Sequence, residues 1–345
     1  MNNVLTFDVE EYFQAEAFAS VVRPEDWPAF DSRVVDATQR LLDVLGSANV
    51  RATFFVLGWV AERQPGLVME IHARGHELAC HGYGHQMLSR LTPQAFAEDV
   101  TRAKKVIEDI AGTRVIGYRA PTFSVTRQTE WSLEVLLEAG FRYDSSIFPI
   151  VHDRYGIPDA PRFAHRIPIA GTGCVMAELP LSTVSVFGQR LPVAGGGYFR
   201  LLPYRLTRLA IRRLNTVEGQ PAVVYLHPWE LDPHQPRLAV GRLTWLRHTV
   251  NIDTTEDKLR RLLADFRFAP ARQVLAETGV LDSGAASCSS LPSWGRARTS
   301  SRWRPSWPRC ASRAAGPPRS STPASTTTRR CREASSPIWS CPSPT

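Results

Sequence analysis

The chain has 345 residues, and 43% of them are apolar, enough for the core of one large α/β domain or two small ones. Residues 281–345 contain ten Arg, one Asp and one Glu and so carry the whole formal charge of +8, which leaves 31 basic and 31 acidic side chains in residues 1–280. A neutral body excludes the basic surface that nucleic acid requires, and we expect no nucleic-acid partner.

Export and membrane segments are not predicted either. The N-terminus, from Met1 to Asp8, has no cationic region followed by a long apolar run. No stretch of the chain approaches the ~20 apolar residues that a membrane span needs. We therefore expect a cytoplasmic protein without a transmembrane segment.

Strands and helices alternate along the chain from residue 1 to residue 280. Strands are predicted at Val4 to Val9, Arg51 to Leu57, Glu77 to Cys80, Val115 to Tyr118, Glu178 to Leu181 and Ala222 to Leu226. Helices are predicted at Asp31 to Ala48, Pro65 to Arg74, Thr92 to Ile110, Thr129 to Ala139, Leu202 to Thr216 and Glu256 to Phe268. Residues 147–200 are loop-rich and end in a tight loop, Gly195 to Arg200. This alternation predicts an α/β fold, a parallel sheet closed into a distorted (β/α) barrel of about seven strands.

The last part of the chain differs in composition from the rest. Beyond residue 281, Ser, Arg, Pro and Ala dominate, Lys is absent, and Cys and Trp are frequent. A disordered basic arm would explain the Ser, Pro and Arg content. The Cys and Trp content favours a shifted reading frame in GC-rich DNA. On either interpretation, residues 281–345 should not form a domain.

Two histidines mark the first candidate site. His81 and His85 lie four residues apart on a glycine-rich loop that follows the strand Glu77 to Cys80. A divalent metal binds neutral imidazole nitrogens at about 2 Å, and glycine allows the backbone to curve around the ion. We therefore predict that both histidines are metal ligands.

Carboxylates follow the first strand. Asp8, Glu10 and Glu11 stand at its C-terminal end, and residues two apart on a strand face the same way, so Asp8 and Glu10 can point into the barrel mouth together. One carboxylate would bind the metal, and the other would act as a base toward water. Every polar cluster in the sequence follows a strand, which is where a (β/α) barrel assembles its active site.

Three more side chains complete the predicted site. Arg119 would hold the base ionised and oriented. His227, after the last strand, would be the general acid that protonates a leaving nitrogen. Asp144 would fix the tautomer of His227, although a role in capping the turn at Ser145 is an alternative.

Aromatic residues near these motifs are candidates for substrate binding. Tyr83, Tyr198 and Trp229 are potential platforms on which sugars stack, with core packing as an equal alternative. Pro121, two residues after Arg119, is grouped with them as substrate-binding.

Five motifs together resemble a known family, the polysaccharide deacetylases with a NodB homology domain, or carbohydrate esterase family four. In chain order, they are Thr6-Phe7-Asp8, His81-x-x-x-His85, Arg119-Ala120-Pro121, Asp144-Ser145-Ser146 and Leu226-His227-Pro228. Three segments further resemble a subgroup associated with exopolysaccharide loci of the exosortase (PEP-CTERM) type. These segments are Asp8 to Gln14, Gly195 to Arg200 and His227 to Pro233.

The resemblance implies a deformed barrel over residues 1–280, with a family extension at about 200–280. It implies Zn²⁺ or a similar divalent ion and the hydrolysis of N-acetyl groups on amino sugars of a polysaccharide or a lipid-linked oligosaccharide, in exopolysaccharide biosynthesis. It also implies the base role for Asp8, the ligand roles for His81 and His85, and the acid role for His227. The metal and a backbone N–H near Tyr83 would stabilise the oxyanion.

One position departs from the family pattern. Many members have two adjacent aspartates and bind the metal with the second, but Val9 occupies that place here. Relatives with a carboxylate two residues after the first make Glu10 the expected ligand, with Glu11 as the alternative. Two other functions stay open: hydrolysis of small cyclic amides or ureides on the same fold, and a non-catalytic carbohydrate-binding module with a decayed site.

Overall fold

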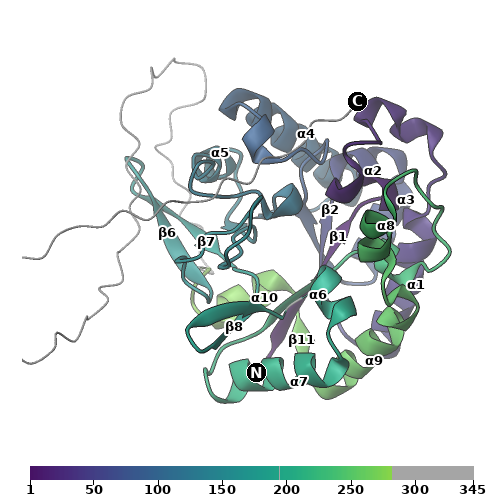
Figure 1. The fold of residues 1–345 in the computed structure, drawn as a ribbon. Helices are drawn as coiled ribbons and strands as arrows, with labels where there is room; N and C mark the ends of the chain where they lie inside the picture. Colours follow the sequence, from purple (N-terminus) through teal and green to yellow (C-terminus); the bar gives the residue numbers. More distant parts are fainter. Residues whose placement is uncertain (194, 282–345) are drawn as a thin grey trace, which may run out of the picture. The chain divides into compact units, whose positions relative to one another are not determined.

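The computed structural model describes residues 1–193 and 195–281 (Figure 1). The predicted tail, apart from Leu281 itself, lies outside the described residues. The strands are β1 (Asn3–Val9), β2 (Thr53–Val56), β3 (Glu77–Cys80), β4 (Gly117–Tyr118), β5 (Tyr143–Asp144), β6 (His165–Ile169), β7 (Cys174–Glu178), β8 (Thr183–Val186), β9 (Gln189–Pro192), β10 (Val223–Leu226) and β11 (Phe268–Ala269). The helices are α1 (Val34–Ser47), α2 (Gly58–Arg63), α3 (Pro65–Ala73), α4 (Pro93–Ala111), α5 (Ser132–Glu138), α6 (Gly196–Leu201), α7 (Tyr204–Thr216), α8 (Arg242–Thr249), α9 (Thr255–Asp265) and α10 (Ala271–Glu277).

Seven parallel strands form the main sheet, in the order β10-β1-β2-β3-β4-β5-β7. β6 extends it antiparallel to β7, and β11 pairs with the start of β1. β8 and β9 form a separate hairpin, and Gly195 bridges to Tyr225 on the free side of β10. The prediction of an α/β fold with a distorted barrel of about seven strands is confirmed.

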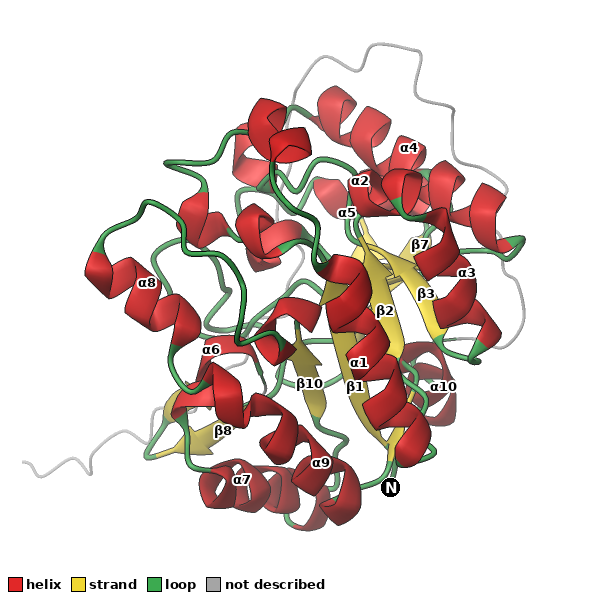
Figure 2. Cartoon of the chain, turned by 90° about the vertical axis from the view of Figure 1, so that its right-hand side faces the viewer, coloured by secondary structure: helices red, strands yellow, loops and turns green. Residues whose placement is uncertain are grey.

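Helices cover the outer side of the sheet. α3 and α4 pack against β3, and α2 and α5 pack against α4 (Figures 1 and 2). Thr92 caps the N-terminus of α4 by accepting a hydrogen bond from the N–H of Ala95, and Gly112 ends the helix with φ of 63°. Within the described part of the chain, no helix combines the length and the apolar character needed to cross a bilayer.

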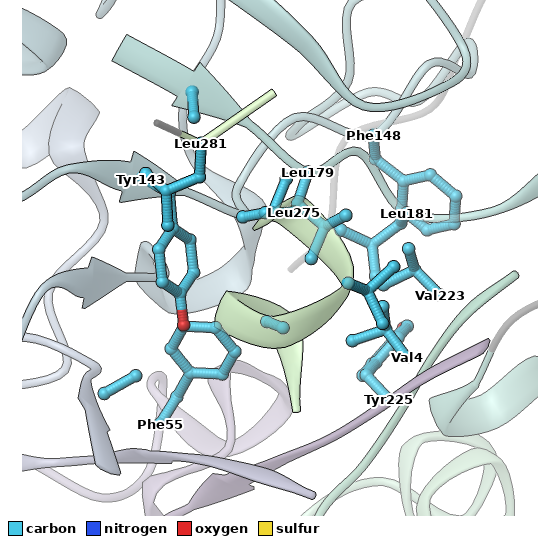
Figure 3. Packing of buried hydrophobic residues seen from close by; sticks show 14 of the residues in the cluster. Val4, Phe55, Tyr143, Phe148, Leu179, Leu181, Val223, Tyr225, Leu275 and Leu281 are labelled. Carbon is cyan, nitrogen blue, oxygen red and sulfur yellow. The ribbon is translucent and has the colours of Figure 1, made fainter. Parts of the chain in front are cut away.

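Alternation along the strands decides which side chains enter the barrel. On β1, Val4 faces a buried cluster that also contains Phe55, Tyr143 and Tyr225 (Figure 3). Thr6 and Asp8 follow Val4 at steps of two residues and therefore line the same face. The apolar cluster fills the lower part of the barrel interior, and polar side chains follow it toward the C-terminal ends of the strands.

The last helix closes the other end of the barrel. Glu77 on β3 accepts hydrogen bonds from the N–H of Arg272 and from the hydroxyl groups of Thr53 and Tyr143. The hydroxyl of Thr53 accepts in turn from the N–H of Ala271. Two inward polar side chains thus satisfy the first N–H groups of α10, which have no partner within the helix.

Two predicted elements differ from the structure between residues 147 and 200. The strand predicted at Glu178 to Leu181 ends at Glu178 instead, as β7. The glycine-rich segment predicted as a loop forms α6. Gly195 precedes α6 with φ of 143°, and a β-carbon there would lie 1.9 Å from the carbonyl oxygen of Tyr225. The glycine therefore permits close contact with β10, and a helix follows it.

Candidate active site

The end of β1 presents its carboxylates in two directions. Asp8 and Glu10 are buried, at 2% exposure each; Glu10 faces the histidine loop, and Asp8 faces His227. Glu11 turns away, and its carboxylate accepts hydrogen bonds from the hydroxyl of Ser32 at 2.5 Å and the N–H of Arg33 at 3.0 Å. Glu10, rather than its alternative Glu11, therefore stands beside the predicted histidines.

The histidine loop is held from α4. Asp99 accepts hydrogen bonds from the N–H groups of Tyr83, at 2.7 Å, and Gly84, at 2.9 Å. Gly82 has φ of 75°, and a β-carbon at this position would lie 3.0 Å from the Asp99 carboxylate, so a larger residue would disturb this contact. The N–H of Tyr83 already donates to Asp99, so the oxyanion donor predicted near Tyr83 would be another N–H.

Three potential ligand atoms converge in the site. Oε2 of Glu10 lies 2.5 Å from Nε2 of His85 and 3.9 Å from Nε2 of His81. One ligand atom from each residue falls within 4.8 Å of the others, and the three side chains are at most 6% exposed. Among the described residues, Oε2 of Glu10 receives no hydrogen bond of acceptable geometry. A buried carboxylate facing two imidazoles in this way is a donor set that fits a divalent cation.

The protonation of His81 and of Glu10 agrees with that fit. Nδ1 of His81 lies 2.9 Å from the carbonyl oxygen of Arg119, which can only accept, so Nδ1 carries the proton and Nε2 keeps its lone pair. Burial is the main cause that lowers the pKa of His81 to about 4. Burial alone would raise the pKa of Glu10, but the neighbouring His85, His227 and His81 hold it far below its usual range.

Arg119 is buried with Asp8. Its Nη1 donates to Oδ1 of Asp8 at 2.7 Å and to the hydroxyl of Thr6 at 2.8 Å. Its Nε and Nη2 donate to the carbonyl oxygen and the hydroxyl of Ser145, and its guanidinium lies 4.1 Å from the ring centroid of Phe55. Arg119 thus holds Oδ1 of Asp8 by a single hydrogen bond and leaves Oδ2 directed toward His227.

His227 is oriented by a residue that the sequence did not suggest. Nδ1 of His227 lies 2.8 Å from Oε1 of Glu230, and Nε of Arg200 donates to Oε2 of Glu230 at 2.7 Å. Nε2 of His227 lies 4.0 Å from Oδ2 of Asp8 and 3.8 Å from Oε1 of Glu10. Burial would lower the pKa of His227, but its hydrogen bond to Glu230 and the charges of Glu10 and Asp8 raise it to about 9.

Asp144 does not orient His227, and that prediction is wrong. Asp144 pairs in register with Tyr118, whose ring packs against Phe96 of α4 on the outer side of the sheet. Its carboxylate accepts from the hydroxyl of Ser146 at 2.5 Å and is hydrogen-bonded to Glu178. Because adjacent residues on a strand face opposite sides, Arg119 and Ser145 point inward while Asp144 points outward. The turn-capping alternative fits, because Asp144 also accepts from the N–H of Ser146.

Trp229 is part of the core rather than a platform for sugar. Its side chain is 7% exposed, and its Nε1 donates to Oε1 of Glu10 at 3.1 Å. The indole is stacked with His227, at a centroid distance of 4.8 Å, and with His248, at 4.4 Å. Of the two alternatives for Trp229, core packing is therefore correct.

The other predicted substrate-binding residues lie in different surroundings. Tyr83 is on the α2–α4 side, where its hydroxyl donates to Glu62 and the guanidinium of Arg102 lies 3.7 Å from its ring centroid. Tyr198 is half-buried on α6, and its side chain is hydrogen-bonded to Tyr155. Pro121 is buried at the start of a short turn. Among the described residues, no hydrogen bond or ring contact joins any of them to the cluster of Glu10, His81 and His85.

Two protein families match the chain in sequence. Residues 26–143 match the family "Polysaccharide deacetylase", and residues 145–276 match a domain of unknown function, DUF3473. A peptidoglycan-N-acetylglucosamine deacetylase of Bacillus cereus is 30% identical over 105 residues, 30% of this chain and 38% of the relative. A putative polysaccharide deacetylase of Bacillus subtilis, YheN, is 34% identical over 115 residues, 33% of this chain and 41% of the relative. The chain thus matches less than half the length of either relative.

Solved structures show the same fold over a longer range. A putative polysaccharide deacetylase from Mycobacterium smegmatis aligns over 79% of this chain and 88% of its own, with a TM-score of 0.52 and 22% identity. The Puue allantoinase aligns over the same shares with a TM-score of 0.51 and 14% identity. The fold is common to both, and in sequence residues 26–143 are similar to the polysaccharide deacetylase family.

Proposed function

We propose that the protein is a metal-dependent hydrolase that removes N-acetyl groups from amino sugars of a polysaccharide. The observation that carries this proposal is the convergence of Glu10, His81 and His85 within 4.8 Å, beside the buried base candidate Asp8. The deacetylase domain over residues 26–143 supports the same reaction class, since the relatives in that region are named for it.

Glu10, His81 and His85 would hold the metal. Three ligands of the types N, N and O leave a position open for water or substrate, as in catalytic zinc sites, and we propose Zn²⁺ as the ion. When bound, the ion would polarise the acetamide carbonyl and lower the pKa of water in the site.

The proton transfers belong to residues of the chain. Asp8 takes a proton from the attacking water through Oδ2, while Arg119 keeps Oδ1 engaged. The oxygen adds to the carbonyl carbon, and the C–N bond then breaks. His227 donates the proton on Nε2 to the departing nitrogen, which leaves a free amine and acetate. Glu230 holds Nδ1 of His227, so that Nε2 faces the reacting group.

The glycan is proposed to be an exopolysaccharide or its lipid-linked precursor. This finer proposal depends on the likeness of residues 8–14, 195–200 and 227–233 to the exosortase-associated subgroup. The cytoplasmic location stays a prediction from the sequence.

Acetate release tests the proposal. The zinc-loaded protein is assayed with an N-acetylglucosamine oligomer and with a cyclic ureide, and its metal content is measured after purification without chelator. Acetate from the oligomer and about one equivalent of metal are expected. Turnover of the ureide alone would favour the cyclic-amide hydrolase. If neither substrate is turned over and the protein contains less than about 0.1 equivalent of metal, the carbohydrate-binding module would be favoured.

A further inference from the structure

We propose that an arginine-lined cleft beside the site binds an anionic group of the substrate, so that the enzyme prefers an acidic glycan over a neutral one. The proposal rests on the proposed function, because it names the kind of substrate that the same site accepts. The acidic group would be a carboxylate or a phosphate, on the glycan or on its carrier, near the N-acetylated sugar.

The cleft is built from distant parts of the chain. It has a volume of about 650 Å³, a size that suits a small ligand or a sugar residue. Segment 15–20 supplies Ala15, Ala17 and Ala19 to one wall, and these small side chains leave room. The remaining walls come from the segment after the histidine loop, from the loop near residue 154, from α6, and from α8.

Positive charge dominates the lining. Arg90, Arg154, Arg200 and Arg247 contribute to it, against the single carboxylate of Glu16. Basic and acidic side chains are equal in number over residues 1–280, so this excess is local. A cleft that concentrates one sign of charge attracts ligands of the opposite sign.

Two of the four arginines are available for a ligand. Arg90 pairs with Glu16 at 2.6 Å, and Arg200 pairs with Glu230 at 2.7 Å. Among the described residues, Arg154 forms an ion pair with its neighbour Asp153 alone, at 4.0 Å, and its side chain is 55% exposed. Arg247 is exposed and forms no ion pair among the described residues. Their guanidinium groups can bind a carboxylate or a phosphate through paired N–H donors.

Two residues of the cleft lining contact residues of the proposed site. Trp229 lines the cleft and donates to Glu10, a predicted metal ligand. Arg200 lines it as well and holds Glu230, which orients His227. A glycan with its acetamide at His227 would therefore pass its neighbouring residue into the cleft. Trp229, the aromatic ring of the lining, is stacked with imidazoles, so charge rather than sugar stacking would select that residue.

Three substrates with known charges test the proposal. Zinc-loaded protein is assayed at low salt with chitotetraose, which is neutral, with a hyaluronan octasaccharide, which carries carboxylates, and with UDP-N-acetylglucosamine, which carries a diphosphate. Acetate release gives kcat/KM for each. Titration calorimetry gives the affinity for each without requiring turnover.

The double variant Arg154→Ala/Arg247→Ala is compared with Arg212→Ala, which removes an exposed arginine of α7 outside the cleft. We expect at least one charged substrate to exceed chitotetraose by about tenfold in kcat/KM, because charged hydrogen bonds outweigh neutral ones. The double variant should bring that ratio close to one, and Arg212→Ala should retain it. Raising the salt to about 0.5 M should also reduce it, by screening.

The outcomes separate the two proposals. Equal rates on all substrates, or a preference for a charged substrate that persists in the double variant, would contradict anion binding by the cleft. Neither result would contradict the proposed deacetylase activity. If no substrate releases acetate, the proposed function fails, and calorimetry decides the cleft. The cleft would then be supported if the wild type binds a charged substrate more tightly than chitotetraose and the double variant does not. Equal affinities for all substrates would contradict it. Preference for hyaluronan would identify a carboxylate, and preference for UDP-N-acetylglucosamine a phosphate.

Discussion

The two halves of the barrel hold their polar groups in different ways. In residues 1–144, Asp8 lies near the end of a parallel strand, His81 and Arg119 each follow one, and backbone groups fix part of their geometry. In residues 145–281, His227 also follows a strand, but its orientation depends on a hydrogen bond to the side chain of Glu230, which is held in turn by Arg200. The first half therefore combines strand register with the single pair of Asp8 and Arg119, and the second half depends on side-chain pairs.

This difference suggests a division of tasks. The first half contributes the proposed metal ligands and base, and its residues 26–143 match the polysaccharide deacetylase family. The second half contributes the proposed acid and the cleft residues Arg154 and Arg247, and it matches the domain of unknown function. Substitutions in the two halves should therefore have distinguishable effects on metal binding and on kcat.

The largest effect is expected in the first half. His81→Ala removes one of three converging ligands, so metal binding and activity should be lost together, with kcat falling by more than about 1,000-fold. Metal analysis and acetate release measure the two losses. His72→Ala, an exposed histidine of α3, is the matched control and should match the wild type. Full activity in metal-free His81→Ala would contradict the metal site.

A smaller and separable effect is expected in the second half. Glu230→Gln keeps the shape of the side chain but removes the charge that supports His227, so kcat should fall about 10- to 100-fold with the metal content unchanged. Glu256→Gln, at a partly exposed ion pair on α9, should leave kcat as it is. Loss of metal in Glu230→Gln would show that the two halves do not act separately.

The smallest effect is expected where the halves meet, at the buried pair of Asp144 and Glu178. Burial raises the pKa of Asp144 to about 6, and burial together with Asp144 raises the pKa of Glu178 well above its usual range. The folded state therefore keeps protons that the unfolded state releases, so this pair stabilises the protein below about pH 4 and loses its contribution as pH rises through 6 and beyond.

Glu178→Gln removes one titrating group from the pair. Between pH 5 and pH 8, the free energy of unfolding of the wild type should fall by about 1–2 kcal/mol relative to that of Glu178→Gln. Urea denaturation at both pH values measures this, with Glu70→Gln, an exposed glutamate of α3, as the control. Parallel changes in wild type and Glu178→Gln would show that the pair does not titrate as described.

Much of the fold follows from local patterns in the sequence. Apolar runs such as Arg51 to Leu57 and the capped helix after Thr92 are predicted within a few residues of the observed elements. The placement of His81, His85 and Glu10 also follows, because strand ends gather at one edge of a parallel sheet. These features depend on residues that are close in sequence or on the known geometry of parallel strands.

The remaining features depend on contacts that no local pattern contains. Asp99 holds the histidine loop from a helix that begins after it. Glu230 lies only three residues after His227, and a capping pattern could have indicated it, since its carboxylate also accepts from the N–H of His227. Asp144 was misassigned because the inward or outward direction of a two-residue strand, β5, depends on its register with β4.

The pairing of β1 has a consequence for the order in which the protein can fold. β1 is the first strand of the described chain, yet two of its three partners, β10 and β11, are the last two. Contacts so distant in the chain form slowly, because a long loop must close before they add any stability. Asp8 and Glu10, at the end of β1, therefore reach their final surroundings only after strands more than 200 residues away have paired with β1.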